Sequence, residues 1–332
     1  MKKFILFIAL LMFVFSIDAT AATKVAQSGC GFLDVSMGAR ASGMGEAFTV
    51  IGQDATALFY NPAGIGEIEG NFDVSVGGTR WIADIQYLYV AGVYNAGVWG
   101  KFGFSLITPD YGDIYGTKVV EGADYGYEPT GLLDVSAFSA GIAYAREFTD
   151  KFTVGGQVKY VTQHLGASDF ELHPTPEDTV IASIDNKIAT PAFDFGLLFA
   201  PGFKSFAFGM SVRNFCPRVT YERIGFEFPL TFALGVGMDV LDFLGDHPDY
   251  SLNIGADMVH PRDWDEQYHV GGEFSFKNMI FLRAGYKFNY FAEGLNAGVG
   301  LNVGGVKIDY SYSEFDLPGI DMVNRVSAGF AF

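Results

Sequence analysis

Six charged residues alternate with apolar neighbours in strand-like segments, and they are the first candidates for chemistry: Asp194, Arg213, Glu273, Arg283, Lys287 and Asp309. Arg283 and Lys287 fall on one face of one segment, where two cations could attract an anionic headgroup or a carboxylate. The alternative is that they pair with Glu273, Asp309 or carboxylates of the N-terminal segment. Pairing is the favoured interpretation, because an unpaired buried charge is costly.

No motif for catalysis or for a cofactor is present. The sequence has no G-x-S-x-G, H-E-x-x-H, C-x-x-C or Walker loop. Four of the five histidines fall in expected loops, whereas His269 lies on an expected strand near Glu273. That pair could hold a proton or a metal ion, but a polar cluster is favoured. The acidic loops could bind Ca²⁺, but they lack its D-x-D-x-D-G pattern, so solvated loops are favoured. We expect no enzyme, no cofactor and no metal site.

Residues 1–21 have the features of a cleaved signal peptide. Lys2 and Lys3 precede an uncharged apolar run from Phe4 to Ile17, and the small residues Ala19-Thr20-Ala21 follow. A retained anchor is the alternative, but the run is shorter than the roughly 20 residues of a spanning helix. We therefore expect an exported protein that is cleaved after Ala21.

The composition narrows the class of exported protein. The chain is 49% hydrophobic and has a net charge of −17, so it offers no basic face to nucleic acid. Beyond Ala21 no apolar run reaches the ~18 residues of a spanning helix. A secreted β-protein or an outer-membrane β-barrel remains. The two cysteines, Cys30 and Cys216, could form a disulfide after export, but one possible pair is weak evidence and free thiols are favoured.

From Asn71 onward the sequence alternates with a period of two, most clearly over Phe152–Thr162. We count about fourteen strands. The long connections follow odd-numbered strands, and most connections after even-numbered strands are tight turns; the long ones span residues 109–131, 164–190 and 215–228. Outer-membrane barrels sort their loops in this way. The prediction is an all-β, transmembrane, antiparallel up-and-down barrel over residues 70–332, closed by a strand that ends on Phe332.

Residues 22–69 precede the barrel and do not alternate. Asp54 is suited to capping a short helix from Ala55 to Tyr60, and Asn61 before Pro62 ends that helix. A barrel of about fourteen strands is wider than one that its own side chains can fill. We therefore predict that this segment forms a helical hatch in the lumen.

The segment GARASGMGEAFTVIGQDATALFYNPAGI is similar to the N-terminal signature of the PorV/PorQ family, within the wider FadL-like group of outer-membrane transport barrels. Later segments also match in style, so the resemblance covers nearly the whole mature chain: Phe193–Leu198, Pro229–Phe232, Leu282–Tyr286 and Lys307–Tyr310. The residues that carry the hatch motif are Gly38, Arg40, Gly43, Met44, Gly45, Asp54, Asn61 and Pro62. We expect their main role to be building and seating the hatch.

The resemblance implies a bacterial outer-membrane barrel in contact with membrane lipid. PorV-like members hold exported cargo by its C-terminal domain, together with the type IX secretion machinery. FadL-like members take up hydrophobic small molecules such as fatty acids, which would contact Phe48, Leu58 and Phe59 here. A structural barrel or a membrane-embedded hydrolase, which would need a Ser–His pair, is the alternative from another class.

Overall fold

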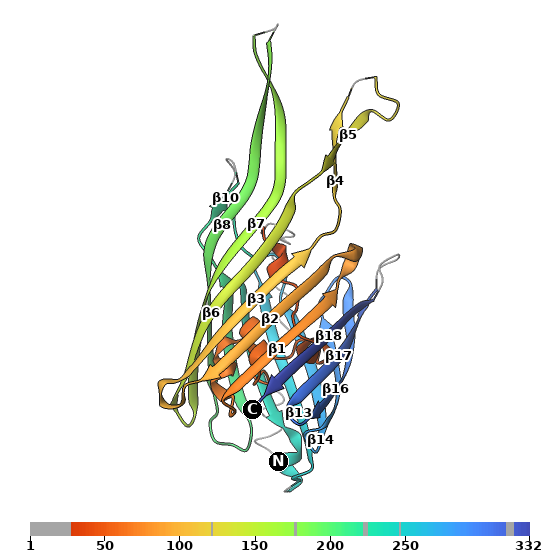
Figure 1. The fold of residues 1–332 in the computed structure, drawn as a ribbon. Coiled ribbons are helices and arrows are strands. Elements are labelled where there is room, and N and C mark those ends of the chain that lie inside the picture. Colours follow the sequence, from red (N-terminus) through yellow and green to blue (C-terminus); the bar gives the residue numbers. More distant parts are fainter. Residues whose placement is uncertain (1–27, 121, 176–177, 222–224, 246, 317–321) are drawn as a thin grey trace.

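The protein is a closed antiparallel β-barrel, seen in a computed structural model that describes residues 28–120, 122–175, 178–221, 225–245, 247–316 and 322–332 (Figure 1). In this part of the chain, fourteen strands pair in the order β1-β18-β17-β16-β15-β14-β13-β12-β9-β8-β7-β6-β3-β2. The predicted fold class and strand number are therefore confirmed. The predicted signal peptide, residues 1–21, lies outside the described residues.

The barrel strands are β1 Phe72–Arg80, β2 Gln86–Asn95, β3 Lys101–Asp110, β6 Val135–Thr149, β7 Phe152–Thr175, β8 Asp178–Phe199, β9 Ala207–Phe215, β12 Thr231–Asp239, β13 Tyr250–Pro261, β14 Gln267–Phe276, β15 Ile280–Phe288, β16 Glu293–Val303, β17 Val306–Phe315 and β18 Val323–Ala331. Short 3₁₀ turns join some of them: η4 Ile82–Asp84, η5 Gly97–Trp99 and η6 Val240–Phe243. Among the described residues, no helix has the length and apolar character needed to cross a membrane.

The apolar and polar residues that alternate along each strand lie on the outer and inner faces of the barrel, respectively. Large apolar side chains stay exposed on the outer face around the barrel, for example Val74, Leu88, Phe104, Ile142, Val158, Phe195, Leu234, Ile254, Val270, Leu282, Val299, Ile308 and Val326. Their strand neighbours point inward and are mostly small, polar or charged, for example Ser75, Ser105, Ser139, Gln157, Ser211, Glu273, Ser311 and Arg325. Such an outer face suits hydrocarbon, and such an inner face suits a polar lumen.

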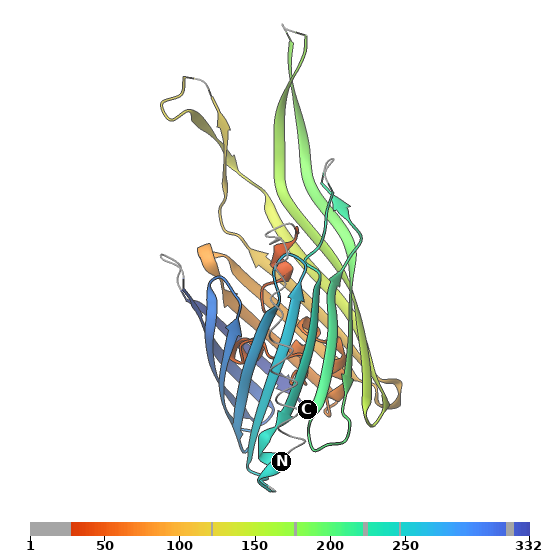
Figure 2. The same ribbon diagram turned by 180° about the vertical axis from the view of Figure 1, so that it is seen from behind.

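The prediction that three segments are long loops is wrong, because part of the backbone in each segment pairs into a hairpin. Residues 109–131 contain β4 Tyr115–Val119 and β5 Tyr127–Leu132, and residues 215–228 contain β10 Val219–Thr220 and β11 Gly225–Phe226. Residues 164–190 continue β7 and β8 beyond the barrel. The β7–β8 and β4–β5 hairpins project from one rim in both views (Figure 1, Figure 2). Long connections mark the external side of an outer-membrane barrel, so this rim is the external one.

Candidate functional site: the hatch segment and its seat in the lumen

Residues 28–71, which we call the hatch segment, lie inside the barrel and include η1 Gly31–Leu33, α2 Ala39–Gly43, η2 Ala55–Phe59 and η3 Pro62–Glu67 (Figure 1). The Asp54 carboxylate caps η2 by accepting a hydrogen bond from the Thr56 N–H at 2.9 Å. Asn61-Pro62 ends this helix, as the sequence predicts, and it also begins the next one. The Asn61 side-chain amide oxygen accepts from the Ala63 N–H at 3.1 Å, and Pro62 is the first residue of η3.

Glycines on the barrel wall allow the hatch segment to approach at backbone distance. A Cβ atom on Gly271 of β14 would lie 1.9 Å from the Met44 carbonyl oxygen, and one on Gly285 of β15 would lie 2.2 Å from the Met44 carbonyl carbon. Gly45 adopts a φ of 61°, and its own Cβ would lie 2.8 Å from the Tyr286 nitrogen. Only glycine fits at such approaches, so motif and wall glycines form one contact surface.

The same device recurs on the opposite side of the barrel. A Cβ on Gly196 of β8 would lie 1.9 Å from the Asn61 amide oxygen, and one on Gly155 of β7 would lie 2.4 Å from the Pro62 backbone. The Asn61 amide nitrogen donates to the Thr49 carbonyl at 2.8 Å and to the Leu197 carbonyl at 3.2 Å. Asn61 therefore joins two parts of the hatch segment to strand β8.

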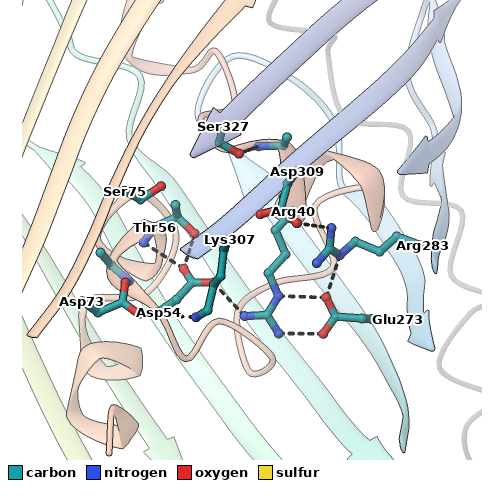
Figure 3. Close-up of polar contacts among 12 residues, drawn as sticks. Arg40, Asp54, Thr56, Asp73, Ser75, Glu273, Arg283, Lys307, Asp309 and Ser327 are labelled. Carbon is teal, nitrogen blue, oxygen red and sulfur yellow. Dashed lines mark hydrogen bonds and ion pairs between the residues drawn. The ribbon is translucent and has the colours of Figure 1, made fainter. Parts of the chain in front are cut away.

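Ion pairs hold the hatch segment to one side of the lumen (Figure 3). Arg40 binds Glu273 of β14 with two bonds, Nε–Oε2 at 2.9 Å and Nη2–Oε1 at 2.8 Å, and its Nη1 donates to Asp54 at 2.7 Å. Arg283 of β15 donates to the same Glu273 at 2.6 Å and to Asp309 of β17 at 2.6 Å. Burial alone would raise the pKa of Asp54, but the Arg40 guanidinium outweighs it and lowers that pKa. Paired in this way, the buried charges are tolerated.

A second set of ion pairs lies nearer the external side. The Lys287 ammonium lies 2.5 Å from Glu46 of the hatch segment and 2.5 Å from Glu293 of β16. Burial would raise the pKa of Glu46, but the neighbouring ammonium lowers it to about 2. Asp257 of β13 accepts hydrogen bonds from two hatch N–H groups at 2.9 Å each. We call the lumen face of β13–β18 and β1 the charged wall.

The other side of the lumen, formed by β2, β3 and β6–β8, is the apolar wall. Leu58 and Ile65 of the hatch segment are fully buried in a cluster with Tyr89 of β2 and Ile107 of β3. Phe48 is also fully buried, and its ring packs edge-on against Tyr60 with centroids 5.3 Å apart. The cavity beside Leu58 and Phe59 is about 40 Å³. The three predicted ligand contacts thus pack the hatch in this structure, and whether they also contact a ligand stays a prediction.

Histidine and cysteine side chains do not form a reactive cluster in the described part of the chain. His269 hydrogen-bonds to the Tyr290 hydroxyl at 2.7 Å and to the Glu46 carbonyl at 3.2 Å. No group of three or more candidate metal ligands occurs among the described residues. Cys30 and Cys216 are free thiols, and burial raises the pKa of Cys30 to about 12, which disfavours the reactive thiolate.

Two cavities lie on either side of the hatch segment. The periplasmic one, of about 460 Å³, is bordered by Arg40, Asp54 and Glu273. The external one, of about 360 Å³, lies between Asp34 and Glu46 of the hatch segment and the external ends of β1 and β13–β16. Residues of the hatch segment line both cavities.

Comparison with known proteins decides the family. Residues 126–317, more than half of the chain, match the family described as "Type IX secretion system membrane protein PorP/SprF". The chain belongs to the PorP/SprF family. Its barrel is closed and has an apolar outer face. Together with its membership of this family, this makes it a protein of the outer membrane. The matched region excludes the hatch motif, so the PorV/PorQ assignment that rests on this motif stays a prediction.

Several solved structures share the fold of this PorP/SprF member. It is similar to the Pseudomonas putida toluene transporter TodX (13% identity, TM-score 0.58, 88% of this chain and 96% of that chain). It is also similar to a Pseudomonas aeruginosa FadL homologue (12% identity, TM-score 0.56, 94% and 100%). The "CymD monoaromatic hydrocarbon channel" gives 11% identity, a TM-score of 0.57, and coverage of 90% and 98%. No curated protein sequence matches the chain. At these identities the likeness shows the fold alone.

The structure brings most of the sequence-predicted residues of this PorP/SprF member together. Arg40 and Asp54 of the motif meet Glu273, Arg283 and Asp309 of the wall. Of the remaining lumen charges, Lys287 pairs with Glu46 and Glu293, Asp194 pairs with Lys159 at 2.8 Å, and Arg213 donates to the Phe59 carbonyl at 2.7 Å. The favoured interpretation of Arg283 and Lys287 as paired cations is therefore confirmed by the geometry.

Sequence reasoning missed the wall glycines and Lys159. The signal for the glycines was present, because Gly155, Gly196, Gly271 and Gly285 lie in predicted strands where glycine is unfavourable. An isolated glycine in a strand often marks a close backbone approach.

Proposed function

We propose that the protein is a closed outer-membrane component of a type IX secretion apparatus that holds or passes exported cargo, as PorV/PorQ-type proteins do. The observation that carries this proposal is the seating of the hatch segment on both walls of the lumen. Arg40, Glu46 and Asp54 are paired on the charged wall, while Leu58 and Ile65 are buried against the apolar wall. A lumen filled in this way suits a docking barrel better than an open diffusion channel.

Membership of the PorP/SprF family supports the association with type IX secretion. The shape of the external rim supports docking. β7 and β8 continue past their last barrel partners, with Val135 opposite Leu165 and Phe193 opposite Phe215, and they form a free hairpin above the rim (Figure 1). Contact with exported cargo would take place at such surfaces, outside the filled lumen.

A locked-hatch experiment tests this function. A strain that lacks the gene is complemented with the wild type or with an Ala39→Cys, Ser327→Cys double variant, because the Ala39 N–H donates to the Ser327 hydroxyl at 3.2 Å. We expect type IX cargo to be lost from the cell surface and the medium in the deletion strain, and to be restored by both the wild type and the oxidised double variant. Normal secretion in the deletion strain would refute the proposal. Secretion restored only after reduction of the double variant would show that the hatch must move.

The second candidate is a FadL-like channel for hydrophobic small molecules. One feature of the wall favours it: β3 and β6 pair from Lys101–Ala145 to Ile107–Ser139, but β3 continues to Asp110 without further pairing to β6. The wall could open towards the membrane at this point, next to the apolar wall. Uptake of a labelled long-chain fatty acid should then fall in the deletion strain while cargo secretion stays normal.

A further inference from the structure

Arg213 differs from the other cations of the lumen. Among the described residues, Arg40, Lys159, Arg283, Lys287 and Lys307 each have a carboxylate within 4.0 Å, and all three guanidinium nitrogens of Arg325 donate to serine or backbone oxygens: the pairs are Arg40–Glu273, Lys159–Asp194, Arg283–Asp309, Lys287–Glu46 and Lys307–Asp73. Arg213 of β9 has no carboxylate at this distance in the described chain. Its Nη1 donates to the Phe59 carbonyl, and its buried Nε has no hydrogen-bond partner.

Leaving a guanidinium in this state is costly. A buried donor without a partner loses the full free energy of its hydration, and a charge without a counter-ion loses more. The ring of Tyr60 offers partial compensation, since the Arg213 guanidinium carbon lies 5.7 Å from its centroid. The Arg213 Nε is closed to solvent, so an acceptor in the adjoining space would instead pair with the part of the guanidinium that borders that space.

That space is the external cavity of about 360 Å³, which Arg213 borders. Its rim carries Trp81, Trp264 and Phe291, of which Trp264 is 45% and Phe291 is 82% exposed. Trp81 is held in place by Phe315, whose ring lies edge-on at 5.3 Å. A cavity of this size suits a small molecule. It is too small for a folded cargo domain.

The polar lining selects among small molecules. Asp34, Gln267 and Glu293 face the same cavity as Arg213. Their oxygens can accept hydrogen bonds from hydroxyl groups. A purely apolar ligand would leave these groups without partners, and a dianion would be repelled by the carboxylates of Asp34, Glu46 and Glu293, which all line the cavity. A single carboxylate for Arg213, several hydroxyl groups, and a ring that can lie on an exposed aromatic face would satisfy all of them.

We propose that the external cavity is a binding site for a small hydroxylated monocarboxylate of the sugar-acid class, with Arg213 as the carboxylate receptor. The Arg213 guanidinium donates to the ligand carboxylate from the side that borders the cavity, because its Nε is closed to solvent. Asp34, Glu293 and Gln267 accept from its hydroxyls, and Trp264 contacts its ring. This site is independent of the secretion role and of the channel alternative, because the ligand neither crosses the lumen nor displaces the hatch segment.

Glucuronate is the probe, and the full-length protein is purified in detergent. Binding is followed by titration calorimetry and by tryptophan fluorescence, to which Trp81 and Trp264 of the cavity both contribute. We expect saturable binding of glucuronate at concentrations up to about 10 mM and little binding of glucose, which lacks the carboxylate. Arg213→Gln should weaken glucuronate binding about 10- to 100-fold, the loss that accompanies removal of a charge-assisted hydrogen bond.

Arg218→Gln is the matched control, because Arg218 is an exposed arginine that donates to the Gly225 carbonyl in the external loop. It should bind glucuronate like the wild type. If Arg213→Gln does not fold, Trp264→Ala provides a second test, since Trp264 is exposed on the rim, and glucuronate binding should weaken several-fold.

Three results would overturn the proposal. They are no glucuronate binding to the wild type, glucose binding as tightly as glucuronate, and unchanged glucuronate binding in both Arg213→Gln and Trp264→Ala. Benzoate binding more tightly than glucuronate, and depending on Arg213, would overturn the sugar-acid class in favour of an apolar carboxylate.

Discussion

The two walls of the lumen hold the same hatch segment by different means. On the charged wall, Arg40 and Glu46 each meet a partner at a fixed distance and angle. On the apolar wall, Leu58 and Ile65 pack among aliphatic and aromatic side chains without a polar bond. Apolar burial is strong but non-directional, whereas charged hydrogen bonds are directional. We infer that the apolar wall mainly retains the segment, while its register is fixed by the charged wall together with the hydrogen bond from Asn61 to the Leu197 carbonyl of β8.

The largest effect should come from the glycine contacts with Met44, which lie on the charged wall. Gly271→Val would place a side chain where the Met44 carbonyl lies 1.9 Å from an added Cβ, and we expect a loss of about 3 kcal/mol or more, or failure to assemble. Gly272→Val is the matched control, because the nearest atom to its Cβ is 3.6 Å away. Heat-modifiable gel migration and urea unfolding measure both variants. Equal losses in the two would refute a specific seat for the hatch.

Removing the shared acid Glu273 should destabilise the protein by a similar amount. Glu273→Ala leaves both Arg40 and Arg283 short of a counter-ion inside the barrel, at a cost of about 3–5 kcal/mol. The exposed pair Arg80–Asp84 is the control. Asp84→Ala should change the free energy of unfolding by less than about 1 kcal/mol. Bilayer conductance should rise only in Glu273→Ala, and a silent pore in that variant would show that the apolar wall alone closes the barrel.

The apolar wall should tolerate a change of shape that the charged wall does not. Leu58→Ala leaves a void and should cost about 2–4 kcal/mol, whereas Leu58→Met should cost less than about 1.5 kcal/mol. On the charged wall the isosteric Glu273→Gln should keep most of the cost of Glu273→Ala, because it removes the charge. Urea unfolding of all four variants makes the comparison. A large loss in Leu58→Met would mean that the apolar wall also fixes the register.

The smallest effect concerns the dependence of the free energy of unfolding on pH. Asp34 of the hatch segment is exposed to the external cavity but enclosed by the barrel, and this confinement raises the pKa of its carboxyl to about 7. Facing it are Arg213 of β9, Lys159 of β7, Asp263 after β13, and Glu46 of its own segment. Because the folded state holds this proton more tightly than the unfolded state, its contribution to stability is greatest at low pH and falls as the pH rises towards 7.

Asp34→Asn should remove this part of the pH dependence between about pH 4 and 7. Urea unfolding of the wild type and the variant at a series of pH values makes the measurement. The difference should be modest, because water in the cavity screens the charge. A wild-type slope that persists in Asp34→Asn would assign the effect to another group.

The barrel was predictable from the sequence because each strand carries its two-residue period and its turns locally. The long external hairpins were not, because residues 164–190 carry several acidic residues and the sequence Pro-Thr-Pro, which are typical of a solvated loop. The hatch motif could be placed in the lumen, and the partners of Arg283 and Lys287 could be narrowed to Glu273, Asp309 or carboxylates of the N-terminal segment. The partner of Arg40 could not be predicted, because it depends on the rotational position of the segment, which is set by long-range contacts such as Gly271 with Met44.

The seam of the barrel has a consequence for the order of assembly. β1 and β18 pair from Asp73–Ala331 to Arg80–Asn324, and the carbonyl oxygen of Phe332 accepts hydrogen bonds from the N–H groups of Asn71 and Phe72 at 2.6 and 3.0 Å. Phe332 thus holds the junction at which the hatch segment leaves the lumen. Because these contacts join residues that are far apart in the sequence, we expect them to be among the slowest to form. A seam that closes late would leave the barrel open for the hatch segment to enter during folding.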